Sequence, residues 1–246
     1  MGAGVGGSGS MQISNGLSIV SPHGYIGYYG SLGVARVSGP GTTWTNSLDM
    51  TIGLEGVGHL EIFDGGTVSS RIRTFVASRP NSFGSVTVRG AGSRWTNLGQ
   101  VELGTHGSGP SLPGIGLISI SDGGLVSIAG DTRECLRIQD QISGLSFITI
   151  DNGGQLAFGG DVDGSLADFL ALIRGPGDIR YWDTSIRDWA NISGATRDED
   201  YTLAYITTGE LSGYTVLTVN TIPEPATLTC LAIGALAILR RRNRKG

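Results

Sequence analysis

The residue types that catalyse reactions or bind metals are few in this chain, and they do not occur at the spacing that catalytic or metal sites require. Cys135 lies between Arg133 and Arg137, which would lower the pKa of its thiol, but no histidine accompanies it as a base, so we expect it to be buried and inert. The only lysine is Lys245, and neither a P-loop nor a GxSxG segment occurs. The three histidines form no close-spaced pair of ligands: His23, His59 and His106. The sequence therefore predicts no catalytic residue and no cofactor.

Three aspartates at glycine-containing turns, Asp64, Asp122 and Asp151, raise the question of calcium binding. A calcium ion needs several oxygen ligands that converge on it, whereas each of these turns supplies one Asx residue. Asn and Asp before glycine are also typical of tight turns, because they tolerate the left-handed backbone region. We expect turn formation at these positions and predict no metal site.

Two tryptophans, Trp44 and Trp95, occupy equivalent positions of a repeated segment and allow two interpretations. Exposed indoles would stack on sugar rings and thereby bind carbohydrate. Buried indoles would pack at a corner of the fold, with Asn46 and Asn97 forming hydrogen bonds along the stack of repeats. The second interpretation is favoured, because aromatic side chains usually contribute most through burial. Another pair, Trp182 and Trp189, is expected to pack in the C-terminal part.

The last 25 residues have a distinct organisation. Pro223-Glu224-Pro225 predicts a rigid, extended segment, because each proline fixes its own φ and restricts the residue before it. Residues 226–239 carry no charge and would form a helix of about 21 Å, short of the roughly 30 Å of a membrane core. Arg240, Arg241 and Arg242 follow as a basic stop, in agreement with the positive-inside rule. A proline linker before a buried helix is the alternative, but the order of these three features favours a short transmembrane segment.

Residues 222–246 resemble a PEP-CTERM sorting signal. The resemblance implies that the protein is exported, that the membrane enzyme exosortase recognises Pro223, Glu224 and Pro225, and that the tail is processed near them. It further implies a location at the cell envelope, with the inner membrane before processing and the cell surface or the extracellular matrix afterwards. A sorting tail requires an export signal, and no basic segment precedes an apolar run at the N-terminus. We therefore expect the N-terminus of the sequence to be incomplete.

The composition favours an all-β protein. Glycine provides 42 of the 246 residues, more than twice the average share of about 7 per cent. Residues 1–239 carry 12 basic and 21 acidic side chains and lack basic clusters, which argues against nucleic-acid binding. Only two cysteines occur, so a disulfide framework is not expected.

Internal repeats cover residues 10–158. Residues 33–46 match residues 84–97 at an offset of 51, and residues 58–70 match residues 116–128 at an offset of 58. Within each copy apolar residues alternate, as in Leu60/Ile62 and Ile118/Ile120, which is typical of strands with one buried face. Four Asx-Gly pairs recur between these strands: Asn15-Gly16, Asp64-Gly65, Asp122-Gly123 and Asn152-Gly153.

These repeats predict a β-solenoid, or β-helix, in which one 51-residue unit forms about two coils and the repeats form about six. A β-sandwich is the alternative, since it too is built from short, regularly spaced strands. Near-identical repeats favour the solenoid, because equivalent residues then stack on one another. The repeat also resembles the one shared by autotransporter passenger proteins and PEP-CTERM proteins, which implies a surface-exposed solenoid with an architectural role.

We divide the chain into a solenoid at 1–160, a small α+β cap or independent domain at 161–221 and the sorting segment at 222–246. Within the cap, Ser165 is a candidate N-cap of a helix whose face carries Leu166, Phe169, Leu170 and Ile173 and which Gly175 ends. Residues 201–209 and 213–220 are expected to form two strands.

These features predict a non-enzymatic, exported structural or adhesive protein that contacts exosortase, with exopolysaccharide as a candidate partner. One alternative is a β-helix lyase or hydrolase acting on acidic polysaccharide, with a basic patch built from five arginines: Arg71, Arg73, Arg79, Arg89 and Arg94. No matching carboxylate cluster is evident for it. A further alternative is a single-pass membrane protein that keeps its tail.

Overall fold

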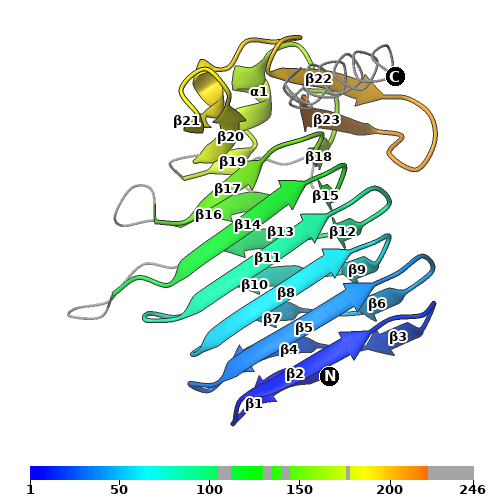
Figure 1. Ribbon diagram of the computed structural model, residues 1–246, viewed down its shortest axis with the longest axis vertical. Helices are drawn as coiled ribbons and strands as arrows, with labels where there is room; N and C mark the ends of the chain where they lie inside the picture. Colours follow the sequence, from blue (N-terminus) through cyan, green and yellow to red (C-terminus); the bar gives the residue numbers. More distant parts are fainter. Residues whose placement is uncertain (105–111, 130–134, 140–144, 176–177, 221–246) are drawn as a thin grey trace, which may run out of the picture.

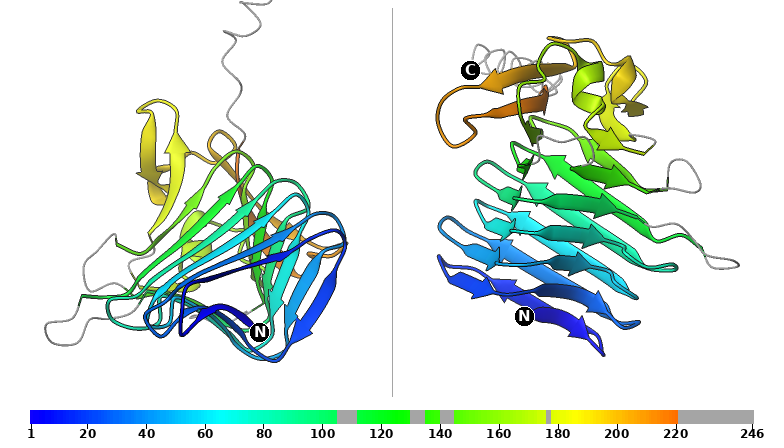
Figure 2. Two further views of the ribbon diagram at one scale, coloured as in Figure 1. Left: turned by 60° about the horizontal axis from the view of Figure 1, so that its bottom comes forward. Right: turned by 180° about the vertical axis from the view of Figure 1, so that it is seen from behind.

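A computed structural model describes residues 1–104, 112–129, 135–139, 145–175 and 178–220. The chain winds into a parallel β-helix that ends in a C-terminal cap (Figure 1). Seen nearer the axis, three sheets enclose a roughly triangular core (Figure 2). The predicted β-solenoid is therefore confirmed, and the β-sandwich is excluded. No helix among the described residues is long and apolar enough to span a membrane, and the expected span at 226–239 lies outside them.

Each coil contributes one strand to each of the three sheets. Sheet A is formed by β1 (Gly2–Val5), β4 (Gly24–Tyr28), β7 (Met50–Ile52), β10 (Arg73–Val76), β13 (Gln100–Leu103), β16 (Leu136–Ile138) and β19 (Ile173–Arg174). Sheet B is formed by β2 (Gly9–Ile13), β5 (Leu32–Ser38), β8 (Val57–Phe63), β11 (Phe83–Arg89), β14 (Ile115–Ser121), β17 (Phe147–Ile150), β20 (Ile179–Asp183) and β21 (Asp188–Asn191). Sheet C is formed by β3 (Ser18–Ser21), β6 (Thr43–Asn46), β9 (Thr67–Ser70), β12 (Arg94–Asn97), β15 (Leu125–Ile128), β18 (Gln155–Gly159), β23 (Tyr214–Val219) and β22 (Tyr201–Ile206).

The register of sheet B explains the repeats. Leu60 is paired with Val86, and Val86 is paired with Ile118, so Leu60 and Ile118 lie in one column two coils apart. Gly33 is likewise two coils from Gly84. The 51-residue unit thus spans two coils, as expected, because its two halves differ in sequence. All these apolar side chains point inward, and burying each large one contributes about 1.5–3 kcal/mol.

The corner between sheets B and C follows the predicted turn chemistry. Asn15, Asp64, Asp122 and Asn152 all have positive φ, between 43° and 61°, and each is followed by a glycine with positive φ. The second and fourth coils use a Gly-x-Gly turn instead, and the hydroxyl that follows it stabilises the neighbouring corner. The backbone N–H of Gly65 donates to Ser93 Oγ at 3.0 Å. The two turn types alternate over the first five coils, which is a further reason why the sequence repeats every second coil there.

The corner between sheets A and B depends on close backbone approach. Gly53 has φ +73°, and a Cβ at this position would lie 2.1 Å from the carbonyl oxygen of Phe83 in the next coil. A larger residue would therefore meet both a strained backbone and a steric clash. Glycine at this position allows the backbones of adjacent coils to approach to the normal distance between neighbouring strands of a sheet.

The C-terminal segment closes the end of the solenoid. Helix α1 (Leu166–Leu170) is capped by Ser165, which accepts a hydrogen bond from the backbone N–H of Asp168 as predicted, and its Phe169 packs against Phe158 at 4.8 Å between ring centroids. The helix ends at Leu170, so its expected extension to Gly175 is wrong. Ile173 instead belongs to β19 and pairs with Leu136 of sheet A.

Two antiparallel additions complete this end. The expected strands at 201–209 and 213–220 are β22 and β23, and β23 pairs antiparallel with β18 of the last coil. Strand β21 pairs antiparallel with β20, and the 3₁₀ helix η1 (Ile192–Gly194) follows it. A single cluster of buried side chains runs from Ile13 to Val219. The solenoid and this segment therefore share one core.

Candidate functional site

The two repeat tryptophans lie inside the solenoid. Trp44 and Trp95 are both fully buried in sheet C, within strands rather than at a corner. Neither indole presents a face to solvent, so the carbohydrate-stacking interpretation is wrong and the packing interpretation holds. Trp44 Nε1 donates to Ser21 Oγ at 3.1 Å. By contrast, Trp182 and Trp189 lie opposite each other in β20 and β21 in an edge-to-face contact at 5.6 Å.

Asn46 and Asn97 form the hydrogen bonds that the sequence suggests. Asn97 Oδ1 accepts bonds of 2.7 Å from both Ser70 Oγ and Thr74 Oγ1, and Asn46 Oδ1 accepts one of 2.9 Å from Ser21 Oγ. These side chains are buried, so unpaired polar groups would carry a desolvation cost. These hydrogen bonds form only when the strands of neighbouring coils are in this register, so they help to fix it.

The turn aspartates gather no metal-binding cluster within the described part of the chain. Asp122 Oδ1 instead accepts a 2.5 Å hydrogen bond from Asn152 Nδ2 of the next coil. Burial raises the pKa of the Asp151 carboxyl, and the nearby charge of Asp122 raises it further. Asp122 and Asn152 thus join the corners of two neighbouring coils.

The remaining sequence candidates lie apart from one another. His59 Nδ1 is 2.7 Å from Ser85 Oγ on the outer face of sheet B, whereas His23 stacks on Tyr25 beside sheet A. Cys135 is buried, as expected. His106 lies outside the described residues, as do Pro223, Glu224, Pro225, Arg240, Arg241 and Arg242.

The five arginines of the proposed basic patch do not converge. Arg73 lies in sheet A and Arg89 in sheet B, where its guanidinium stands 4.9 Å from the centre of the Phe63 ring. Arg94 lies in sheet C, while Arg71 and Arg79 occupy connecting turns. A single basic face, as the polysaccharide-lyase alternative expects, is not formed by these residues.

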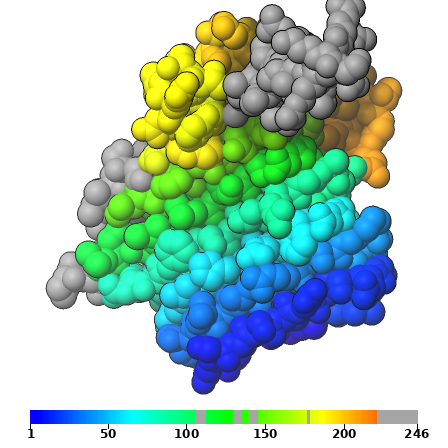
Figure 3. Space-filling view, in the orientation of Figure 1, coloured from blue at the N-terminus to red at the C-terminus, as the bar shows by residue number. Residues whose placement is uncertain are grey.

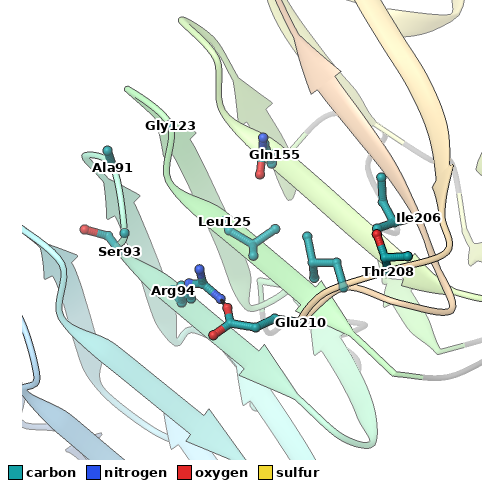
Figure 4. A pocket seen from close by; sticks show the side chains of 11 residues that line it. Ala91, Ser93, Arg94, Gly123, Leu125, Gln155, Ile206, Thr208 and Glu210 are labelled. Atoms are coloured by element: carbon teal, nitrogen blue, oxygen red, sulfur yellow. Dashed lines mark hydrogen bonds and ion pairs between the residues drawn. The ribbon is translucent and has the colours of Figure 1, made fainter.

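Arg94 instead belongs to a groove with a volume of about 430 Å³ between sheet C and the β22–β23 hairpin. Figure 4 shows Arg94 and Glu210 pointing toward each other across it. They form an ion pair between a strand of the solenoid and the turn of the hairpin. Leu125 and Gln155 continue the solenoid wall, and Ile206, Thr208 and Leu211 form the opposite wall.

The groove lies at one end of a row of outward-facing side chains on sheet C. By register the row contains, coil after coil, Ser18, Thr43, Thr67, Arg94, Leu125 and Gln155. A second outward row contains Thr45, Ser69, Thr96 and Ser127. Ser18 Oγ and Thr43 Oγ1 are 2.7 Å apart, and Ser69 Oγ donates to Thr45 Oγ1 at 3.3 Å. We call Ser18, Thr43, Thr45, Thr67, Ser69 and Thr96 the hydroxyl strip.

Sequence reasoning placed Arg94 in a basic patch and missed the groove. Its two walls come from segments separated by 116 residues at the Arg94–Glu210 pair. No periodicity connects the hairpin with the repeats. The hydroxyl strip, by contrast, could have been predicted from the sequence. Side chains alternate between the two faces of a strand, and Ser and Thr recur at the outward positions of the sheet C strands.

Comparison with known proteins identifies the tail. A family model described as the PEP-CTERM protein-sorting motif matches residues 221–245, one residue before the expected start. Neither the curated proteins nor the solved structures yielded a match to this chain. The motif confirms the predicted sorting signal and implies an exported surface protein that is recognised and processed by exosortase, a membrane protein. Such proteins are held at the envelope before cleavage.

Proposed function

We propose that this chain is a non-catalytic structural and adhesive protein of the bacterial cell surface or extracellular matrix. The observation that carries the proposal is the joining of a sorting motif to a continuous β-helix. Parallel strands in register give the body a hydrogen-bonded ladder along its whole length, which resists bending and suits a spacer. The space-filling view shows successive coils as parallel bands over one face of the molecule (Figure 3).

The sorting motif supplies the route to the surface. In this proposal the PEP-CTERM tail holds the protein in the inner membrane through residues 226–239, with Arg240, Arg241 and Arg242 on the cytoplasmic side. Exosortase binds Pro223-Glu224-Pro225 and cleaves near it. The β-helix then reaches the surface or the matrix, where its outer faces contact polysaccharide.

The processing step is tested by mass spectrometry of the mature C-terminus in a bacterium that carries an exosortase. We expect the surface fraction to lack Gly246, and a Glu224→Ala variant to keep it and to stay in the inner membrane. Arg36→Ala, which changes an exposed arginine of sheet B, is the matched control and should be processed normally. An intact Gly246 on the surface-located protein would instead support a permanent single-pass anchor.

The enzymatic alternative is tested separately on the purified chain. Incubation with polygalacturonate and alginate should release neither unsaturated nor reducing ends, since Arg73, Arg89 and Arg94 lie on three different sheets. Release of either product at a rate that depends on protein concentration would overturn the non-catalytic assignment.

A further inference from the structure

We propose that the groove between sheet C and the β22–β23 hairpin binds a segment of neutral polysaccharide, and that the hydroxyl strip extends this binding surface along the solenoid. This inference rests on the proposed function, because it assigns the polysaccharide contact to one face. The argument depends on three features of the face: the chemistry of the groove, its charge and the regularity of the strip.

The lining of the groove matches the two kinds of surface that a sugar ring presents. Ile206 and Leu211, which are partly buried against the buried Leu125, offer an apolar surface to the C–H groups of a pyranose. Gln155 and Thr208 offer an amide and a hydroxyl, which donate to and accept from sugar hydroxyls. A hollow that combines apolar surface with a few polar groups is suited to such a ligand.

The charges of the groove favour a neutral ligand over an acidic one. Arg94 and Glu210 neutralise each other, and the side chain of Glu210 is 74% exposed. Exposed ion pairs contribute only about 0–1 kcal/mol, so a ligand hydroxyl can enter between the two groups at little cost. A uronate carboxylate would have to displace Glu210 from Arg94 and then lie beside its negative charge. Asp122, in the adjoining corner, would add to the repulsion.

The strip favours a polymer over a single sugar. Its hydroxyls repeat at the spacing of neighbouring strands, about 4.8 Å, and lead from the first coil to the edge of the groove. The second and third coils each place two hydroxyls outward at equivalent positions, and Ser18 and Thr96 extend the two rows by one coil each. A chain of identical hydroxylated units can use several of these positions at once, and the contributions of successive contacts then add along the strand.

The experiment is isothermal titration of the full chain in detergent with neutral hexasaccharides, namely cellohexaose, maltohexaose and mannohexaose. We expect one or more of them to bind, and Arg94→Ala and Gln155→Ala to weaken that binding at least tenfold. Arg36→Ala is the matched control, because Arg36 is also an exposed strand arginine paired with a glutamate, Glu61, but lies on sheet B. Thermal unfolding of each variant checks that it is folded.

Two further measurements sharpen the test. The double variant Thr43→Val/Thr67→Val should weaken hexasaccharide binding while leaving the affinity for the corresponding disaccharide unchanged, since only the longer ligand reaches the strip. Hexagalacturonate should bind at least tenfold more weakly than the best neutral hexamer.

The proposal would be overturned by any of three results. These are no binding of any neutral hexamer at millimolar concentration, stronger binding of hexagalacturonate, or equal effects of Arg94→Ala and Arg36→Ala. Failure of the proposed function is seen elsewhere, in the location and C-terminal mass of the protein in cells. A protein that is exported and processed normally but does not need Arg94 for binding would refute this site alone.

Discussion

At the scale of single residues, the first four coils of the solenoid alternate between two kinds of core packing in sheet C. One kind places a tryptophan and an asparagine in sheet C, as in Trp95 and Asn97, and the next places smaller residues there, such as Val68 and Ser70. Large side chains of one coil thereby fill the space left by small ones in its neighbour. Trp44 and Trp95 are the largest of the fully buried side chains in this part of the core.

Trp95→Ala is expected to lower the free energy of unfolding by about 3–5 kcal/mol, because it removes a fully buried indole and leaves a cavity. Chemical denaturation measures the change. Trp189→Ala is the control, since its side chain is 37% exposed at the edge strand β21 and its loss should cost much less. Equal losses in the two variants would contradict the assigned burial.

Asp151 makes stability depend on pH. Burial and the charge of Asp122 raise its pKa above the usual 3.8, so the folded state binds this proton more tightly than the unfolded state does. Stability therefore falls as pH rises through the interval between the two pKa values, and the penalty is fully present at neutral pH. We expect Asp151→Asn to raise the Tm at pH 7 and to lose this advantage below about pH 3.8.

The partner residue provides the control for that prediction. In an Asp122→Asn background the gain from Asp151→Asn should be smaller, because the repulsive charge is already absent. A loss of stability at pH 7 in the single variant would show that the ionised carboxylate is stabilising after all.

At the scale of elements, the corners hold the coils in place. Strands of two to seven residues are too short to set their own register, and the turns between them fix where each strand begins. Asx-Gly or Gly-x-Gly turns connect sheets B and C, and glycines allow close backbone contact between sheets A and B. The corners therefore set the register that places one coil over the next.

Gly53→Ala should destabilise the protein by about 1–3 kcal/mol or more, because its positive φ is unfavourable for alanine and its Cβ would strike the backbone of Phe83. Thermal unfolding measures the loss. Gly194→Ala is the matched control, since no atom lies within 4 Å of the Cβ that it would add, and it should change stability little. If both variants unfold at the same temperature, close approach at this corner is not needed.

At the scale of the whole molecule, the cap prevents the solenoid from continuing. Strand β23 pairs antiparallel with β18 and so occupies its free edge, and Phe169 of α1 packs against Phe158. An uncovered last coil would expose unpaired N–H and C=O groups together with the apolar core, which is a template for association with other chains.

A chain that ends at Gly160 should therefore be less stable than one that ends at Asn220 and should self-associate. Both lack the sorting segment, so the comparison isolates residues 161–220. Light scattering during size-exclusion chromatography gives the molar mass, and thermal unfolding gives the stability. A shorter chain that is monomeric and equally stable would show that the cap is dispensable.

The sequence alone determined the features that depend on local chemistry. Alternating apolar residues require strands with one buried face, Asx-Gly pairs require left-handed corners, and near-identical repeats require stacking in register, so the β-solenoid and the two-coil unit followed from residues 10–158. The sorting tail was also evident, since its signal consists of adjacent residues at one end of the chain.

Only the tertiary structure decided what depends on distant segments. It ended α1 at Leu170, because pairing of Ile173 with Leu136 in sheet A replaces the helical hydrogen bonds that local propensity would favour. It also separated the five arginines onto different faces and brought Glu210 of the hairpin to Arg94, forming the groove. A repeat pattern fixes which side chains point outward, but which outward side chains meet depends on how the non-repeated cap folds back over the last coils.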